Sequence, residues 1–121
     1  MPIQGPSERT TIQQTVAVTP VKRRRHPHFL EQIKGEGAPS RFNLSGDEMV
    51  IGREQGVGIH VLGESVSRRH AKIQRRNQEY AVSDLDSSHG IYLNGIKIYS
   101  AVLRDGDVLQ LGDAVFVYEE G

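Results

Sequence analysis

The sequence contains no cysteine, which excludes several kinds of site at once. Without thiols the chain forms neither a disulfide nor a thiolate-ligated metal centre, and it has no cysteine nucleophile. No apolar run approaches the roughly 20 residues that a membrane-spanning helix needs. The N-terminus also lacks a basic region followed by an apolar stretch. We therefore expect a cytoplasmic protein that is neither exported nor inserted in a membrane.

A helical pattern is also missing. No window keeps an apolar period of 3.6 residues, so helices should be absent or very short. Beyond Phe29, short apolar and polar alternations are separated by Gly, Asn, Asp and Ser, which is typical of half-buried strands. They predict strands over residues 29–34, 40–45, 48–53, 58–62, 70–76, 79–84, 91–94, 96–99, 108–111 and 114–119. The fold class is therefore all-β, an antiparallel β-sandwich of about ten to eleven short strands.

Charge and composition divide the chain into a tail and one domain. Residues 1–27 are rich in Gln, Thr, Pro and Arg and hold only isolated apolar residues, which predicts a flexible tail. Residues 1–29 carry five basic residues against one acidic residue, a net charge of +4. Ten basic and fourteen acidic residues remain in 30–121, a net charge of −4. We expect a basic tail before an acidic domain that spans residues 28–121.

Local chemistry places some of the turns. Asn94-Gly95 lies between two apolar stretches, and a type I′ hairpin turn favours this pair because both residues adopt positive φ. Asp105-Gly106-Asp107 marks a second turn. Residues 52–58, 63–69 and 86–90 are predicted to be loops, and they hold most of the polar residues that could form a site.

Three polar clusters carry the functional signal. They are Ile51-Gly52-Arg53, Ser67-Arg68-Arg69-His70, and the run from Asp84 through Ser87, Ser88 and His89 to Gly90, which leads into Asn94-Gly95. In this order and spacing, across an all-β chain, they resemble the forkhead-associated (FHA) domain family over roughly residues 28–121. The resemblance implies an FHA/SMAD-like sandwich that binds phosphothreonine in a partner protein.

The chemistry of phosphothreonine agrees with this resemblance. The group carries close to two negative charges and three acceptor oxygens, so it needs a fixed guanidinium and several donors. The resemblance implies that Arg53 and Ser67 grip the phosphate, that Arg68 assists, and that Ser88 lines the same pocket. His89 occupies a position where many members have an Asn that holds the peptide backbone. Either a ring nitrogen of His89 takes this role or the peptide is held less tightly.

Other residues are expected to support the site. Gly52 is expected to let the chain turn so that Arg53 points into the pocket. The resemblance implies that His70 is a buried scaffold residue that braces the binding loops, and that Asn94 is structural. Gly90 and Gly95 belong to the same supporting set.

Other chemistries have weaker support. Ser67, His70 and Asp84 include the residue types of a hydrolytic triad, but no Gly-x-Ser-x-Gly elbow accompanies them, so we expect no enzyme. The segments 35–37 and 56–58 are glycine-rich but open no helix, so they are predicted turns and no nucleotide cofactor is expected. The histidines are dispersed, so no metal site is expected.

The sequence leaves two functions open. The first is a phosphothreonine-binding adaptor downstream of a Ser/Thr kinase. Its partner would be a threonine-phosphorylated protein or its own tail, where Thr10, Thr11, Thr15 and Thr19 are candidate phosphorylation sites. The alternative is a phosphate-independent assembly module that uses the sandwich face or the basic tail. The basic run 22–25 lacks stacking aromatics, so a nucleic-acid partner is not expected.

Overall fold

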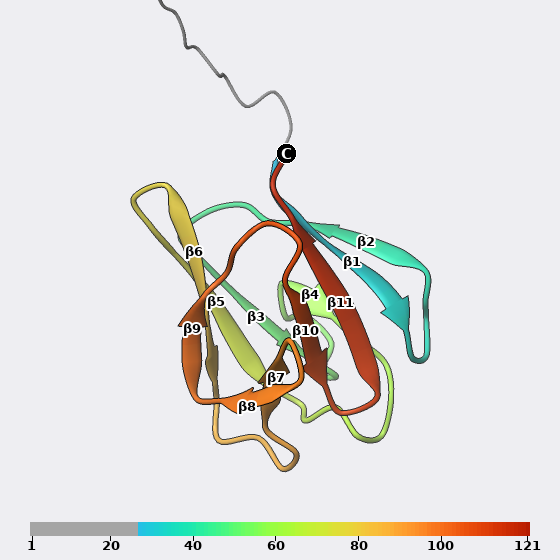
Figure 1. Ribbon diagram of the computed structural model, residues 1–121. Helices are drawn as coiled ribbons and strands as arrows, with labels where there is room; N and C mark the ends of the chain where they lie inside the picture. The colour runs from blue at the N-terminus through green and yellow to red at the C-terminus, as the bar shows by residue number, and fades with distance from the viewer. Residues whose placement is uncertain (1–26) are drawn as a thin grey trace, which may run out of the picture.

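A computed structural model describes residues 27–121 of the chain. The predicted flexible tail lies outside these residues, apart from Pro27, and so do its four candidate phosphorylation sites. The described part is built from two β-sheets that face each other (Figure 1). It contains no helix, and so none that could cross a membrane.

Eleven strands form the sandwich, as predicted. One sheet has six strands in the order β2-β1-β11-β10-β7-β8, and the other has five in the order β4-β3-β5-β6-β9. Their bounds are β1 Phe29–Lys34, β2 Ser40–Asn43, β3 Glu48–Gly52, β4 Ile59–His60, β5 Ala71–Arg76, β6 Glu79–Asp84, β7 Ile91–Leu93, β8 Ile96–Ile98, β9 Ser100–Val102, β10 Val108–Leu111 and β11 Ala114–Glu119.

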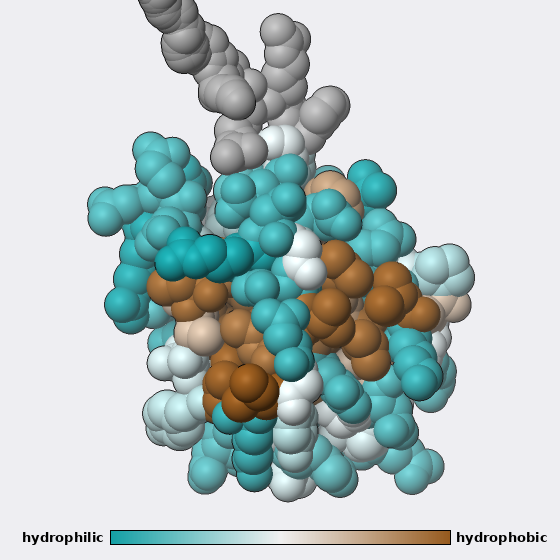
Figure 2. All heavy atoms as spheres, in the orientation of Figure 1, coloured by the Kyte–Doolittle hydropathy of each residue, from teal (hydrophilic) through white to brown (hydrophobic). Residues whose placement is uncertain are grey.

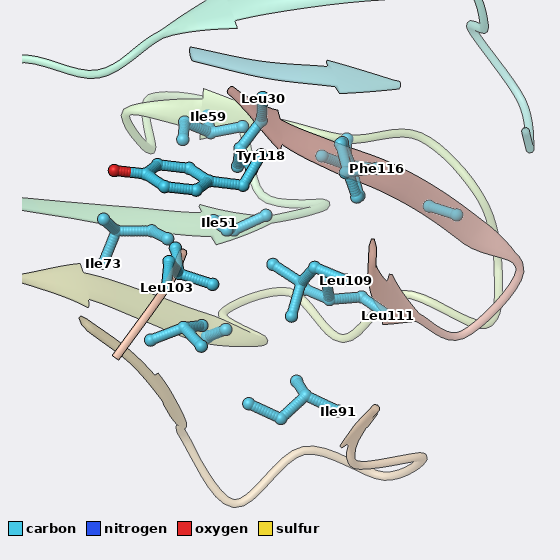
Figure 3. Packing of buried hydrophobic residues seen from close by; sticks show 14 of the residues in the cluster. Leu30, Ile51, Ile59, Ile73, Ile91, Leu103, Leu109, Leu111, Phe116 and Tyr118 are labelled. Carbon is cyan, nitrogen blue, oxygen red and sulfur yellow. The ribbon is translucent and has the colours of Figure 1, made fainter. Parts of the chain in front are cut away.

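Alternating burial along the strands explains why the two sheets pack. In β11 the side chains of Ala114, Phe116 and Tyr118 are buried, while those between them are only partly covered. These side chains meet Leu30 from β1 and Ile51 from β3 between the sheets (Figure 3). Each large apolar side chain removed from water contributes about 1.5–3 kcal/mol. The core therefore holds the two sheets together and gives the loops that join the strands a rigid base.

Two details differ from the sequence prediction. The segment 100–102 forms β9, which was not predicted, because the chain leaves one sheet at Ile98 and joins the edge of the other after one residue. In the sequence the apolar and polar alternation of residues 96–98 stops at Ile98-Tyr99, so the predicted strand ended at residue 99 and the strand that follows was missed. β4 pairs with β3 in parallel, with Ile51 opposite Ile59, and is the one parallel pair in the described sheets.

The polar loops gather at one end of the sandwich. The loops that join β4 to β5 and β6 to β7 lie at the end opposite the C-terminus (Figure 1), and the β3–β4 loop begins beside them, where Arg53 and Glu54 bond to Ser67 and Arg68. The Asn94-Gly95 turn has the predicted positive φ values of 51° and 83°. Figure 2 shows apolar side chains gathered in a band across the face turned to the viewer. Six large apolar side chains of the described surface are well exposed: Ile33, Leu62, Ile96, Tyr99, Val102 and Val108.

Candidate functional site

Arg53 follows directly after β3, and its side chain is held in place by the neighbouring loop. Its Nε donates a hydrogen bond to the carbonyl oxygen of Val66 at 2.9 Å. Its backbone N–H donates to Ser67, and the next N–H, from Glu54, donates to Arg68, each at 3.1 Å. Within the described residues neither Nη group of Arg53 has a hydrogen-bond or ion-pair partner. The guanidinium is therefore oriented while both Nη groups remain able to bind a ligand.

Gly52 is required by the close approach of these two loops. A Cβ at this position would lie 2.0 Å from the carbonyl oxygen of Arg68, which no side chain can tolerate. The φ of Gly52 lies outside the left-handed region, so its backbone conformation does not require a glycine. The glycine is required because the two loops approach each other closely here. The role expected from the sequence, turning the chain toward the site, is thus replaced by a packing role.

His70 lies fully buried beneath the site and joins two loops. Its Nδ1 accepts a hydrogen bond from the backbone N–H of Ser67 at 3.0 Å. Its Nε2 lies 2.8 Å from the carbonyl oxygen of Gly90, which can only accept, so Nε2 carries the proton. Burial lowers the pKa of His70, although the bond to Gly90 and the charge of Asp84 oppose this shift. The neutral ring is therefore the form that fits these bonds.

Hydrogen bonds also fix the serines of the site. The Ser67 hydroxyl oxygen accepts the backbone N–H of Ser88 at 3.1 Å, so its own proton can be donated to a ligand. Beside it, the Ser87 hydroxyl donates to the carboxylate of Asp84 and accepts the N–H of Gly90 at 2.8 Å. These bonds shape the loop between β6 and β7.

Asn94 and Gly95 lie in the hairpin between β7 and β8. The side chain of Asn94 donates to Asp107 at 3.0 Å and accepts the N–H of Val108 at 2.9 Å. The hairpin is thereby fastened to the start of β10. Among the described residues, Asn94 and Gly95 form no hydrogen bond with the binding loops.

The five predicted phosphopeptide-binding residues come together around one hollow of about 260 Å³. Three further residues, all from the loop between β4 and β5, also line this hollow. The sequence did not single them out. The complete lining is Arg53, Glu64, Ser65, Val66, Ser67, Arg68, Ser88 and His89. The segment 63–69 was predicted as a loop, but nothing in its residue types distinguished these three.

Glu54 is another residue that the sequence analysis missed. Its carboxylate lies 3.7 Å from a guanidinium nitrogen of Arg68 and 3.6 Å from one of Arg69. Both arginine side chains are more than half exposed, so these ion pairs are weak. Arg68 is therefore shared between the hollow and Glu54. Within residues 27–121 no three His, Asp or Glu side chains are grouped to hold a metal ion.

Comparison with known proteins assigns the family. The family model of the FHA domain matches residues 49–112, more than half of the chain, and the chain belongs to this family. It is similar to the oxoglutarate dehydrogenase inhibitor of Corynebacterium jeikeium, with 36% identity over 88 residues, or 73% of this chain. It is also similar to the glycogen accumulation regulator GarA of Mycobacterium tuberculosis, with 38% identity over the same share. The chain spans 61% and 54% of the lengths of these two relatives.

A solved FHA structure gives the same fold. It comes from a study of phosphothreonine-dependent FHA domain interactions and superposes with a TM-score of 0.71 at 28% sequence identity. The match covers 78% of this chain and 96% of that one. The predicted family and sandwich fold are thus confirmed.

Proposed function

We propose that this domain is a phosphothreonine-peptide-binding adaptor that acts downstream of Ser/Thr kinases and has no catalysis of its own. The observation that carries the proposal is the hydrogen bond from Arg53 Nε to the Val66 carbonyl oxygen. This bond orients the guanidinium before any ligand arrives and leaves both Nη groups for a phosphate. Arg53 thus supplies the bidentate contact that phosphate recognition favours.

The rest of the hollow supplies complementary groups. The Ser67 hydroxyl can donate one hydrogen bond, because its oxygen already accepts the Ser88 N–H. Arg68 adds a second positive charge at the rim. Because the loops are fastened by backbone bonds and by His70, little ordering cost remains when a ligand binds.

The geometry also supports a function without catalysis. In a hydrolytic triad a histidine accepts the proton of the nucleophilic serine. The Nδ1 of His70 already accepts the Ser67 N–H, and its Nε2 donates to Gly90, so neither nitrogen is free for the Ser67 hydroxyl. Among the relatives, one is named an inhibitor and another a regulator, which fits a protein that acts by binding.

The proposed partner is a cytoplasmic protein phosphorylated on threonine. The chain's own Thr10, Thr11, Thr15 and Thr19 are further candidate ligands, since they precede the domain proposed for residues 28–121. A tethered ligand competes at an effective concentration near the millimolar range. Phosphorylation of the tail is therefore expected to weaken binding of an outside phosphopeptide.

The decisive experiment titrates the full chain with a phosphothreonine peptide library and with the same peptides unphosphorylated. The proposal expects a subset of phosphopeptides to bind and their unphosphorylated twins not to bind. Equal binding of both sets would favour the alternative, a phosphate-independent assembly module. That alternative is supported by the side chains of Ile96 and Tyr99, which are 68% and 78% exposed. Its own signature is binding that is lost on Tyr99→Asp and kept on Arg53→Ala.

A further inference from the structure

His89 lies on the border between two hollows of opposite charge. On one side it lines the hollow formed by Arg53 and Arg68, where Glu64 is the one acidic residue among the described lining residues. On the other side it lines a hollow of about 540 Å³, where it is the only basic residue among the described residues of the lining. The full lining of this second hollow is Glu36, Leu62, Gly63, Glu64, Ser65, His89, Asp113 and Ala114. His89 is therefore within reach of a ligand in the first hollow, where two basic residues outnumber Glu64, while Glu36, Glu64 and Asp113 line the second.

We propose that His89 binds the phosphate of the phosphothreonine in its protonated form, so that phosphopeptide binding takes up a proton. This inference rests on the proposed function, because it concerns the same site. It gives His89 a role that an amide at this position cannot fill. Asn can hold a peptide backbone through hydrogen bonds, but it gains no charge.

The coupling follows from the chemistry of the two groups. Histidine is the side chain whose ordinary titration falls between pH 5 and 8. A phosphothreonine brings close to two negative charges into the hollow, and a nearby negative charge favours the protonated imidazole. A ligand that favours the protonated form binds more tightly as the pH falls, because binding and protonation are linked. The contribution of His89 to affinity therefore grows on mild acidification.

Several charged or titratable groups face His89 from the elements around it. They are Arg53 after β3, Glu64 and Arg68 in the loop before β5, the buried His70, Glu36 after β1, Tyr92 in β7 and Asp113 after β10. The phosphate itself also titrates near pH 6. A comparison of wild type with a variant changed only at His89 removes these shared contributions, since every other group is present in both proteins.

The experiment compares wild type with His89→Asn and His89→Gln. The probe is the tightest phosphothreonine peptide from the library described above, titrated by calorimetry at pH 8.0 and pH 6.0. We expect the ratio of affinities at pH 6.0 and pH 8.0 to be about three- to tenfold higher for wild type than for either variant, which corresponds to a proton held more tightly in the complex. Near pH 7, titration in two buffers of different ionisation enthalpy should show greater proton uptake for wild type.

A direct readout on the unchanged protein completes the test. At pH 7 the NMR signal of the His89 ring, assigned by its loss in His89→Asn, should move to its protonated position when the peptide is added. Equal affinity ratios in wild type and both variants, or a His89 signal that stays at its neutral position, would overturn the inference. Those outcomes leave the proposed function intact if the peptide still binds. A wild-type chain that binds no phosphopeptide at any pH would instead overturn both.

Discussion

Hollows lie at both ends of the sandwich, and the hollow around Arg53 differs from one at the opposite end in how its polar groups are held. The larger hollow, of about 420 Å³, lies away from the binding loops, where Pro27 and the β2–β3 turn meet Tyr80. Arg75 is the one arginine or lysine that lines it among residues 27–121, and its Nε donates a hydrogen bond to the carbonyl oxygen of Asn77, two residues further along its own turn. The smaller hollow holds Arg53, which is anchored by a carbonyl from a different loop.

Size does not decide between these two hollows, because a third, of about 540 Å³, borders the binding loops at His89 and is larger than both. A ligand is recognised by donors that are fixed before it arrives, and such donors need supports from distant parts of the chain. At the smaller hollow, buried His70 joins the loops before β5 and before β7. Substitutions at one end of the molecule, with matched substitutions at the other where a counterpart exists, test this difference.

Substitution of a glycine at each end should give the largest effect. In Gly52→Ala the new Cβ would meet the Arg68 carbonyl at 2.0 Å, so we expect a loss of stability of about 3 kcal/mol or more. Gly46, at the larger hollow, has open space but a φ of 70°, so Gly46→Ala should cost about 1 kcal/mol. Urea unfolding measures both, and equal costs would contradict the proposed tight contact between the loops.

Arg53→Ala should remove phosphopeptide binding without unfolding the domain. We expect a loss of about 2–4 kcal/mol in binding, because one member of a desolvated charge pair disappears. The melting temperature should change little, since Arg53 lies at the rim of the core. The matched control is Arg75→Ala, which deletes the same group at the other end and should leave affinity unchanged. If Arg53→Ala stayed within about twofold of wild type in calorimetry, the site assignment would be wrong.

His70→Ala should reduce both stability and binding, unlike Arg53→Ala. Removal of the buried ring leaves the Ser67 N–H and the Gly90 carbonyl without partners, which costs about 1–3 kcal/mol. The two properties are measured by thermal melting and by calorimetry. Unchanged melting together with lost binding would show that His70 contacts the ligand and is not a support.

The pH dependence of stability should also involve His70. Burial lowers the pKa of the folded group below its ordinary value near 6.5, so the unfolded chain binds more protons in this range. The neutral ring therefore stabilises the fold above about pH 6.5, and this contribution is lost as the pH falls through the lower folded pKa. Urea unfolding between pH 8 and pH 5 should show a smaller loss of stability in His70→Gln than in wild type. Identical losses in the two proteins would contradict this account.

Glu54→Gln should give the smallest effect, an increase in phosphopeptide affinity of at most about threefold. The substitution frees Arg68 from a weak, exposed ion pair with the Glu54 carboxylate. The effect should shrink as salt is added, because exposed charges are screened. Reduced affinity would mean that Glu54 orients Arg68 for the ligand and does not compete for it.

The sequence predicted those features that depend on local chemistry. Asn94-Gly95 forms the expected turn because its conformation depends on only two residues. Residues 114–118 are all apolar or aromatic, so the sequence predicted the strand β11, but only the structure shows that Ala114, Phe116 and Tyr118 are its buried face. The residue types at Arg53 and Ser67 indicated phosphate chemistry through their resemblance to a family pattern.

Features that depend on contacts between distant parts of the chain could not be predicted from the sequence. The carbonyl that anchors Arg53 belongs to Val66, and nothing in an apolar residue signals that its backbone oxygen is an acceptor for a guanidinium. The contact of Glu54 with Arg68 arises from the folding of two loops against each other. Ser65 contacts the start of β11 by accepting the N–H of Asp113 at 2.8 Å, across 48 residues of chain.

The central claim is that the smaller, anchored hollow binds phosphothreonine and the larger one does not. An NMR titration of the full chain with a phosphothreonine peptide reports on both ends in one experiment. The claim predicts that backbone amide signals of residues 53–54, 66–70 and 87–90 shift with the peptide, while those of residues 45–47 and 75–80 stay in place. Shifts confined to the end that holds Tyr80 and Arg75, or equal shifts with the unphosphorylated peptide, would contradict it.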